Sequence, residues 1–134
     1  MNKNIFREYD IRGLVKDDLT GGVVEKLGMA MGTRVLKAGG KKIAVGRDVR
    51  LSSPELLDYL SSGICSTGCG VVDIGTVPTP LLYFAQYHLD VQGGIMITGS
   101  HNPPEFNGFK LLVNKGTIHG EEIQKIAREI EAGD

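Results

Sequence analysis

The chain has 134 residues, a length that fits one domain with a core of its own. Its 15 basic and 16 acidic side chains nearly cancel, so the chain lacks the basic excess typical of nucleic-acid-binding domains. The polar N-terminus is followed by no apolar signal region, and no apolar run approaches the roughly 20 residues needed to cross a bilayer. We therefore expect a cytoplasmic protein that has neither nucleic acid nor membrane as a partner.

The cysteines and two of the histidines carry no recognisable metal or redox motif. Cys65 and Cys69 have neither a zinc nor a thioredoxin spacing, and we interpret them as free thiols in a reducing cytosol. His88 and His119 are isolated in the sequence. The sequence thus predicts no complete metal site made by this chain alone.

The first part of the chain predicts an irregular start and then two helices. Residues 5–13 form a short irregular or extended opening. Apolar residues at helical spacing predict a helix over residues 23–36, which ends at the glycine pair that follows. A second helix is expected to begin at Ser52, because Ser52 and Glu55 have the spacing of a capping box.

Short apolar runs bounded by glycines predict four strands with helices between them. The strands cover residues 42–46, 70–75, 94–98 and 108–113, and two further helices cover residues 79–88 and 121–131. The loop before the last strand is too short for a crossover helix, so this strand runs antiparallel to the third. The expected fold is one α/β domain over residues 1–134, with three α/β/α layers and a mostly parallel four-stranded mixed sheet whose last strand is antiparallel.

The loop between the last two predicted strands is the most informative segment of the chain. It begins at Ser100, which is followed directly by His101, Asn102 and two prolines. A serine needs a base, a metal or a positive field to act as a nucleophile, and no Gly-x-Ser-x-Gly elbow surrounds Ser100. From chemistry alone, Ser100 is either reactive or a capping serine. His101 likewise either assists phosphate binding and proton transfer or is a loop histidine bonded to backbone.

Three basic residues are further candidates. Arg12 offers a planar fork that suits a phosphate. Lys110 lies within an apolar strand, where it faces solvent by default or else points into a cleft. Arg47 follows a strand at its carboxyl end, where α/β sheets bind ligands, but we expect a structural ion pair between Arg47 and Asp48.

Four segments resemble the N-terminal domain of the α-D-phosphohexomutases, within them the bacterial phosphomannomutase/phosphoglucomutase type. The segments are FREYDIRG at 6–13, VGRDVRLSSP at 45–54, DIGTVPTP at 73–80 and TGSHNPPEFNGFK at 98–110. They stand in the family's order and span nearly the whole chain. Phosphoglucosamine mutases usually open with a Gly-Thr-Asp-Gly sequence and have an aliphatic residue where this chain has Phe109. Many relatives carry alanine where this chain has Gly99, a variant that agrees with the mannose/glucose subgroup.

The resemblance implies a phosphoryl carrier. Ser100 would donate its phosphoryl group to a hexose phosphate, mannose or glucose, and exchange it between C1 and C6 through a bisphosphate sugar intermediate. Mg²⁺ would bind the phosphate on Ser100, which is the metal-binding residue of this chain. The family's pattern places catalytic roles at Ser100, His101 and Lys110, and substrate contacts at Tyr9, Arg12 and Asn102.

Three loops of the family have no counterpart in this sequence. The enzymes have four domains, and the Asp-x-Asp-x-Asp metal loop, the sugar-reading loop and the distal phosphate loop belong to the other three. We therefore expect this chain to be domain I of a longer mutase, with the other domains of the same polypeptide as partners and little or no turnover alone. A phosphoglucosamine mutase domain and a non-catalytic phosphate-binding α/β module remain alternatives, although both Gly-x-Gly-x-x-Gly and the P-loop pattern are missing.

Overall fold

The structure is a computed structural model that describes residues 1–114 and 116–133. Its elements in chain order are η1 (Lys3–Ile5), β1 (Ile11–Leu14), α1 (Gly21–Lys37), β2 (Lys42–Arg47), α2 (Ser53–Ser66), β3 (Gly70–Thr76), α3 (Thr79–His88), β4 (Gly93–Ile97), β5 (Phe106–Val113), β6 (Gly116–Thr117) and α4 (Glu121–Ala132). All the predicted helices and strands are present, with small differences at their ends. Of the helices in the described ranges, none is long and apolar enough to span a bilayer.

The sheet is mixed and has the spatial order β1-β5-β4-β2-β3, with β6 paired to the far end of β5. Strands β3, β2 and β4 are parallel, and β5 runs antiparallel to β4 as predicted. The prediction of four strands missed β1 and β6, so the described residues form six. Strand β1 pairs antiparallel with β5 through Ile11 and Phe109, and the parallel part of the sheet is therefore confined to three strands.

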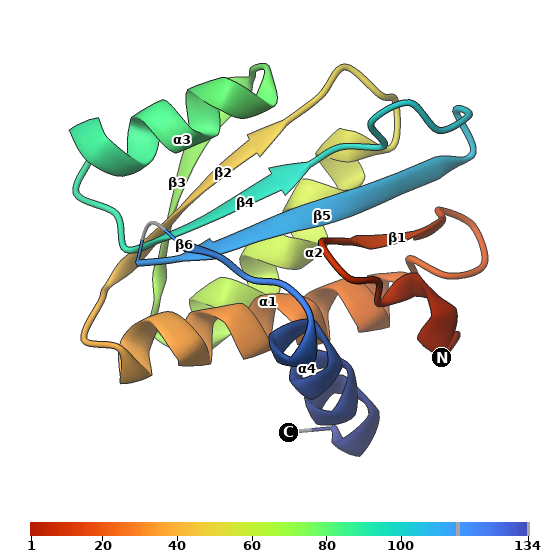
Figure 1. Cartoon of the computed structure of the whole chain (residues 1–134), viewed down its shortest axis with the longest axis horizontal. Coiled ribbons are helices and arrows are strands. Elements are labelled where there is room, and N and C mark those ends of the chain that lie inside the picture. Colours follow the sequence, from red (N-terminus) through yellow and green to blue (C-terminus); the bar gives the residue numbers. More distant parts are fainter. Residues whose placement is uncertain (115, 134) are drawn as a thin grey trace.

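Helices cover both faces of the sheet, which confirms the three-layer prediction (Figure 1). Helix α3 packs on one face, where Leu82 joins Met96 and Leu112 in a small buried cluster. Helices α1, α2 and α4 pack on the other face. The main core lies there and includes Val24, Leu60, Ile95, Phe109 and Ile126. Cys65 and Cys69 are both unpaired, as predicted, and burial raises the pKa of the Cys69 thiol.

Helix α2 begins without the predicted capping box. Ser52 makes no side-chain cap hydrogen bond, and its backbone is already helical, with φ −77° and ψ −18°. Its hydroxyl instead accepts a hydrogen bond from Asn107 Nδ2 at 2.9 Å. The prediction was wrong because this hydroxyl is used in a contact with β5, a partner distant in the sequence.

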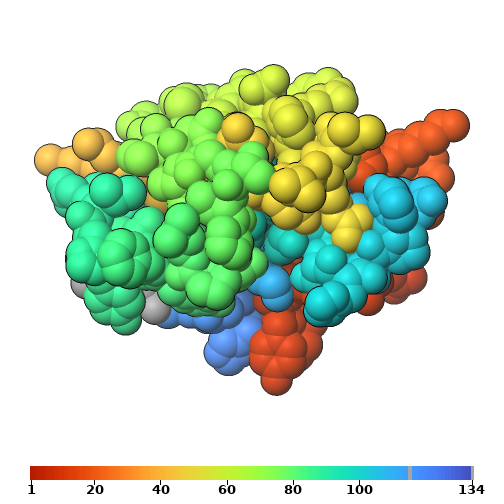
Figure 2. Space-filling model, turned by 90° about the horizontal axis from the view of Figure 1, so that it is seen from above, coloured from red at the N-terminus to blue at the C-terminus, as the bar shows by residue number. Residues whose placement is uncertain are grey.

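The carboxyl ends of the three parallel strands lie at one edge of the sheet, where such sheets usually bind ligands. The β2–α2 loop and the β4–β5 loop both leave from this edge. Seen from above in Figure 2, the yellow surface of the first loop lies beside the cyan surface of the second. The topology thus brings Arg47 and its neighbours close to Ser100.

Candidate functional site

Ser100 lies on a loop with an unusual backbone conformation. We call residues 98–105, between β4 and β5, the Ser100 loop. Ser100 is exposed and has a φ of 53°, a left-handed conformation that is uncommon for residues other than glycine. Its amide donates to Thr98 Oγ1 at 3.0 Å, and the amide of Asn102 donates to the Gly99 carbonyl at 3.0 Å. These local bonds hold the backbone in a tight turn with the serine side chain at the surface.

Arg50 binds the backbone of the Ser100 loop through its side chain, a role that we did not predict from the sequence. Its Nε lies 3.3 Å from Asp48 Oδ2. Its two terminal nitrogens donate to four backbone carbonyls, those of Ser100 (3.2 Å), Asn102 (2.6 Å), Pro103 (2.7 Å) and Phe106 (3.0 Å). Because one rigid fork bonds to carbonyls spread along the loop, the guanidinium fixes the loop's shape.

Gly99 explains how the guanidinium comes so close to the loop. A Cβ at position 99 would lie 2.1 Å from Arg50 Cζ, much closer than two non-bonded carbons approach. A side chain at this position would therefore displace Arg50 from its carbonyl partners. In this structure the glycine before the serine is needed for the Arg50 contact.

Asp48 anchors both Arg50 and the backbone before Ser100. Its carboxylate accepts hydrogen bonds from the Gly99 amide (3.0 Å), the Arg50 amide (3.1 Å) and Ser53 Oγ (2.8 Å). Burial on its own would raise the pKa of Asp48. The hydrogen bonds to the charged form outweigh that effect, so the pKa of Asp48 falls below its ordinary value of 3.8.

The lowered pKa of Asp48 predicts an acid-sensitive site. Between the folded pKa and the ordinary value, the unfolded state binds more protons, so the free energy of unfolding rises with pH there. The contribution of Asp48 is fully present above about pH 5 and is lost as pH falls through the folded pKa. Urea unfolding of the chain and of Asp48→Asn should therefore show a stability difference at pH 6 that shrinks below pH 4. A difference that stays constant with pH would contradict this.

The predicted ion pair between Arg47 and Asp48 is wrong. Arg47 Nη1 lies 2.8 Å from Asp73 Oδ1 on the neighbouring strand β3. Asp48 instead pairs with Arg50. The reason is that the Asp48 carboxylate turns toward the Ser100 loop. There its oxygens accept hydrogen bonds from the backbone amides of Gly99 and Arg50.

Arg12 and Lys110 are brought together by a residue that we did not single out, Asp10. Oδ2 of Asp10 lies 2.6 Å from Arg12 Nε and 3.9 Å from Lys110 Nζ. Lys110 is half-buried. It therefore does not simply face solvent, which was the default expectation for this residue. Its register partner is Met96, which packs under α3, so Lys110 projects from the α3 face of the sheet.

The other predicted residues are less constrained. Tyr9 is 66% exposed, and its ring lies 6.2 Å from that of His119. His101 is exposed, whereas Asn102 is half-buried and donates through Nδ2 to the Gly99 carbonyl at 3.1 Å. The structure thus forms two groups, the Ser100 loop with Asn102 and the Asp10 cluster with Arg12 and Lys110.

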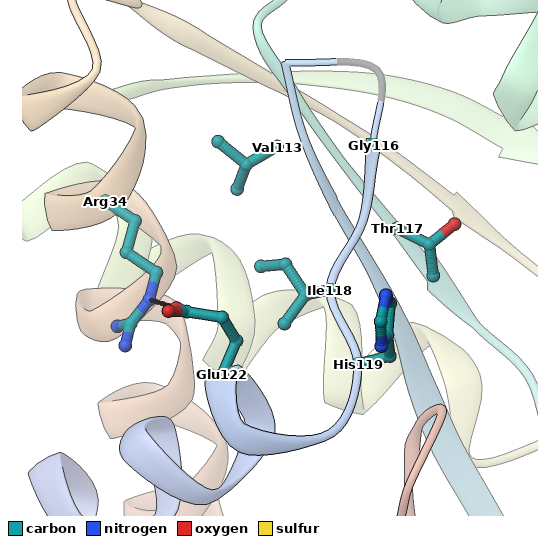
Figure 3. A pocket seen from close by; sticks show the side chains of 7 residues that line it. All are labelled: Arg34, Val113, Gly116, Thr117, Ile118, His119 and Glu122. Atoms are coloured by element: carbon teal, nitrogen blue, oxygen red, sulfur yellow. Dashed lines mark ion pairs between the residues drawn. The ribbon is translucent and has the colours of Figure 1, made fainter.

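The surface has two hollows with different lining residues. One of about 740 Å³ is lined by Ser100, Asn102 and the β2–α2 loop with Asp48 and Arg50. The other, of about 400 Å³, lies where α1, α4 and the β5–β6 hairpin meet, and contains an ion pair between Arg34 and Glu122 (Figure 3). None of the predicted site residues lines this second hollow.

Comparisons with known proteins agree with this architecture. Residues 3–134 match the family model described as phosphoglucomutase/phosphomannomutase, alpha/beta/alpha domain I. The phosphomannomutase/phosphoglucomutase of Pseudomonas aeruginosa is 49% identical over 131 residues, which are 98% of this chain and 28% of that protein. The phosphoglucomutase of Neisseria meningitidis serogroup A is 43% identical over 96% of this chain and 28% of its own length.

A solved structure is also closely similar. A phosphoglucomutase/phosphomannomutase family protein from Burkholderia thailandensis superposes with a TM-score of 0.94 at 40% sequence identity. The match covers 99% of this chain and 31% of that one, so this chain spans less than a third of these relatives. Because the family model covers nearly every residue, the chain belongs to the phosphoglucomutase/phosphomannomutase family, of which it matches domain I.

Proposed function

We propose that this chain is the phosphoserine-bearing domain I, residues 1–134, of a cytoplasmic mutase that interconverts hexose 1-phosphate and hexose 6-phosphate. The observation that carries the proposal is Ser100, an exposed hydroxyl in a left-handed conformation on a loop held by Arg50. The family match and the names of the relatives support a mannose or glucose phosphate as the substrate. The rest of the enzyme would come from the other domains of the same polypeptide.

In this proposal Ser100 carries the phosphoryl group between the two ends of the sugar. The bond between phosphorus and Ser100 Oγ breaks as a sugar hydroxyl oxygen bonds to phosphorus. The sugar hydroxyl loses its proton, and Ser100 Oγ takes one to end as a hydroxyl. The bisphosphate sugar then turns over in the site and returns its other phosphoryl group to Ser100. Such transfer depends mainly on alignment and on neutralising the phosphate charge.

The other site residues would align the phosphate and balance its charge. Arg12 and Lys110 are the cations that we assign to the phosphate oxygens, and Lys110 also relays the proton. His101 takes part in the transfer, while Tyr9 and Asn102 contact the substrate. Lys110 lies on the α3 face of the sheet and its side chain is 29% exposed, which is consistent with this role.

The implied Mg²⁺ does not find a complete site in this chain. Among the residues that the structure describes, no group of three or more His, Cys, Asp or Glu side chains is placed to hold a metal ion. The phosphate on Ser100 would be its ligand from this domain, and the other ligands would come from elsewhere in the enzyme. Charge neutralisation by this chain itself therefore depends on Arg12 and Lys110.

The experiment that tests the proposal measures phosphate on Ser100. We expect intact-mass analysis and site mapping of the full-length mutase, incubated with glucose 1,6-bisphosphate, to find one phosphoryl group on Ser100. The 134-residue chain alone, given glucose 1-phosphate and Mg²⁺, should show little or no turnover. Phosphate at another residue would refute the carrier assignment, and turnover by the chain at the full-length rate would refute the need for other domains. A preference for glucosamine phosphate would instead assign the domain to a phosphoglucosamine mutase.

A further inference from the structure

Asp10 is a carboxylate almost hidden from solvent, with two basic side chains on the same oxygen. Its side chain is only 8% exposed, and Oδ2 contacts both Arg12 Nε and Lys110 Nζ. A buried carboxylate is stable when it is paired and hydrogen-bonded. These two contacts supply that pairing, so the position of each cation depends on Asp10.

The contact with Asp10 leaves the two terminal nitrogens of the Arg12 guanidinium available to a ligand. The carboxylate takes Nε, and in the described part of the chain the two terminal nitrogens have no hydrogen-bond partner. A guanidinium held at Nε presents its remaining N–H groups as a fork that matches two oxygens of a phosphate. The cluster of one carboxylate and two cations also keeps a net charge of +1.

Strand β5 provides the second support of Arg12. A Cβ at Gly108 would lie 2.3 Å from the Ile11 carbonyl oxygen and 3.1 Å from Arg12 Cγ, so the Arg12 stem crosses β5 at this residue. Lys110 follows two residues later on the same face of the strand. In the Asn-Gly-x-Lys sequence, the glycine thus leaves space for the Arg12 side chain, and the lysine is the second cation of the cluster.

We propose that Asp10 is a positioning residue, which holds Arg12 and Lys110 together as a two-cation cradle for the transferring phosphoryl group. This inference rests on the proposed function, because the phosphoryl group is the ligand of the cradle. Asp10 itself does not touch the substrate. Its effect is on alignment, and an error of about 1 Å in the position of a reacting group can lower a rate by about 100-fold.

The first test is the activity of the full-length mutase with Asp10→Asn, which keeps the shape of the side chain but removes its charge. We expect kcat with glucose 1-phosphate to fall about 10- to 100-fold with little change in KM. Asp10→Glu should recover part of that loss. Asp17→Asn is the matched control, because Asp17 is exposed and should keep wild-type kcat. A folded Asp10→Asn enzyme with kcat within twofold of wild type would overturn the proposal.

The second test needs neither activity nor a variant. In ¹⁵N NMR spectra of the wild-type 134-residue chain, the Arg12 Nε–H should exchange with solvent much more slowly than that of the exposed Arg7. Equal exchange rates would contradict the proposal that Asp10 holds Arg12 in position. If the wild-type full-length enzyme shows no mutase activity, the proposed function fails, and the exchange measurement still decides whether Asp10 positions Arg12.

Discussion

Replacing Arg50 by alanine should destabilise the chain by about 3 kcal/mol and release the Ser100 loop, because a largely buried charge pair loses one partner. The Arg50 side chain is only 15% exposed, and its guanidinium bonds to four carbonyls. Its removal leaves these carbonyls and the Asp48 carboxylate without a cationic partner. Ser100, whose left-handed backbone is strained, would then be free to relax toward an ordinary conformation.

Two variants separate the effect of Arg50 from a general loss of charge. Arg50→Lys keeps the charge but lacks the fork, so it should recover only a small part of the stability. Arg128→Ala removes an arginine that is 61% exposed in a surface ion pair, and should change the free energy of unfolding by less than about 1 kcal/mol.

Urea denaturation and amide hydrogen exchange provide the measurement. The informative amides are those of Ser100, Asn102 and Phe106, which are bonded within the loop and at its end. We expect their protection to fall in Arg50→Ala while that of the α1 amides changes only with global stability. If loop protection and stability both stay at the wild-type level, Arg50 does not hold the loop.

The fold was predictable where the local pattern of apolar residues matches the burial of those residues in the folded structure. The strands at 42–46, 70–75, 94–98 and 108–113 are short apolar runs, and each became a strand of the central sheet. Strand β1 was missed because its four residues carry little strand pattern. Its pairing of Ile11 with Phe109 joins residues that are distant in the chain, and that contact stabilises it as a strand.

The sequence suggested candidate chemical groups for the site but not the residues that support them. Ser100, Arg12 and Lys110 were candidates from their residue types, and the family resemblance gave them their expected roles. Arg50 was missed because its partners are backbone carbonyls about fifty residues away, which leave no mark on the sequence. Asp10 was missed because its two cationic partners lie on different strands and meet through the β1–β5 pairing. Candidate reactive groups can therefore be proposed from a sequence, whereas the side chains that contact and support them appear only in the fold.

Ser100→Ala should lower kcat of the full-length mutase by at least about 10⁴-fold, since loss of a nucleophile is among the largest single effects known in enzymes. The fold should survive, because the loop is held through the Ser100 backbone amide and carbonyl. Alanine and serine also have a similar conformational free-energy cost at a φ of 53°. The free energy of unfolding should therefore change by less than about 0.5 kcal/mol.

Two further substitutions at this position distinguish the hydroxyl from the backbone. Ser100→Gly removes the hydroxyl but adopts positive φ without strain, so it should be as inactive as alanine. Ser100→Thr keeps a hydroxyl but places a β-branched side chain at positive φ, where such residues are rarely found, so it should retain partial activity and be less stable. Intact-mass analysis should find no phosphoryl group on the Ala and Gly variants. An alanine variant that keeps more than a tenth of wild-type kcat would show that the carrier is another residue, and the loop held by Arg50 would then need a different function.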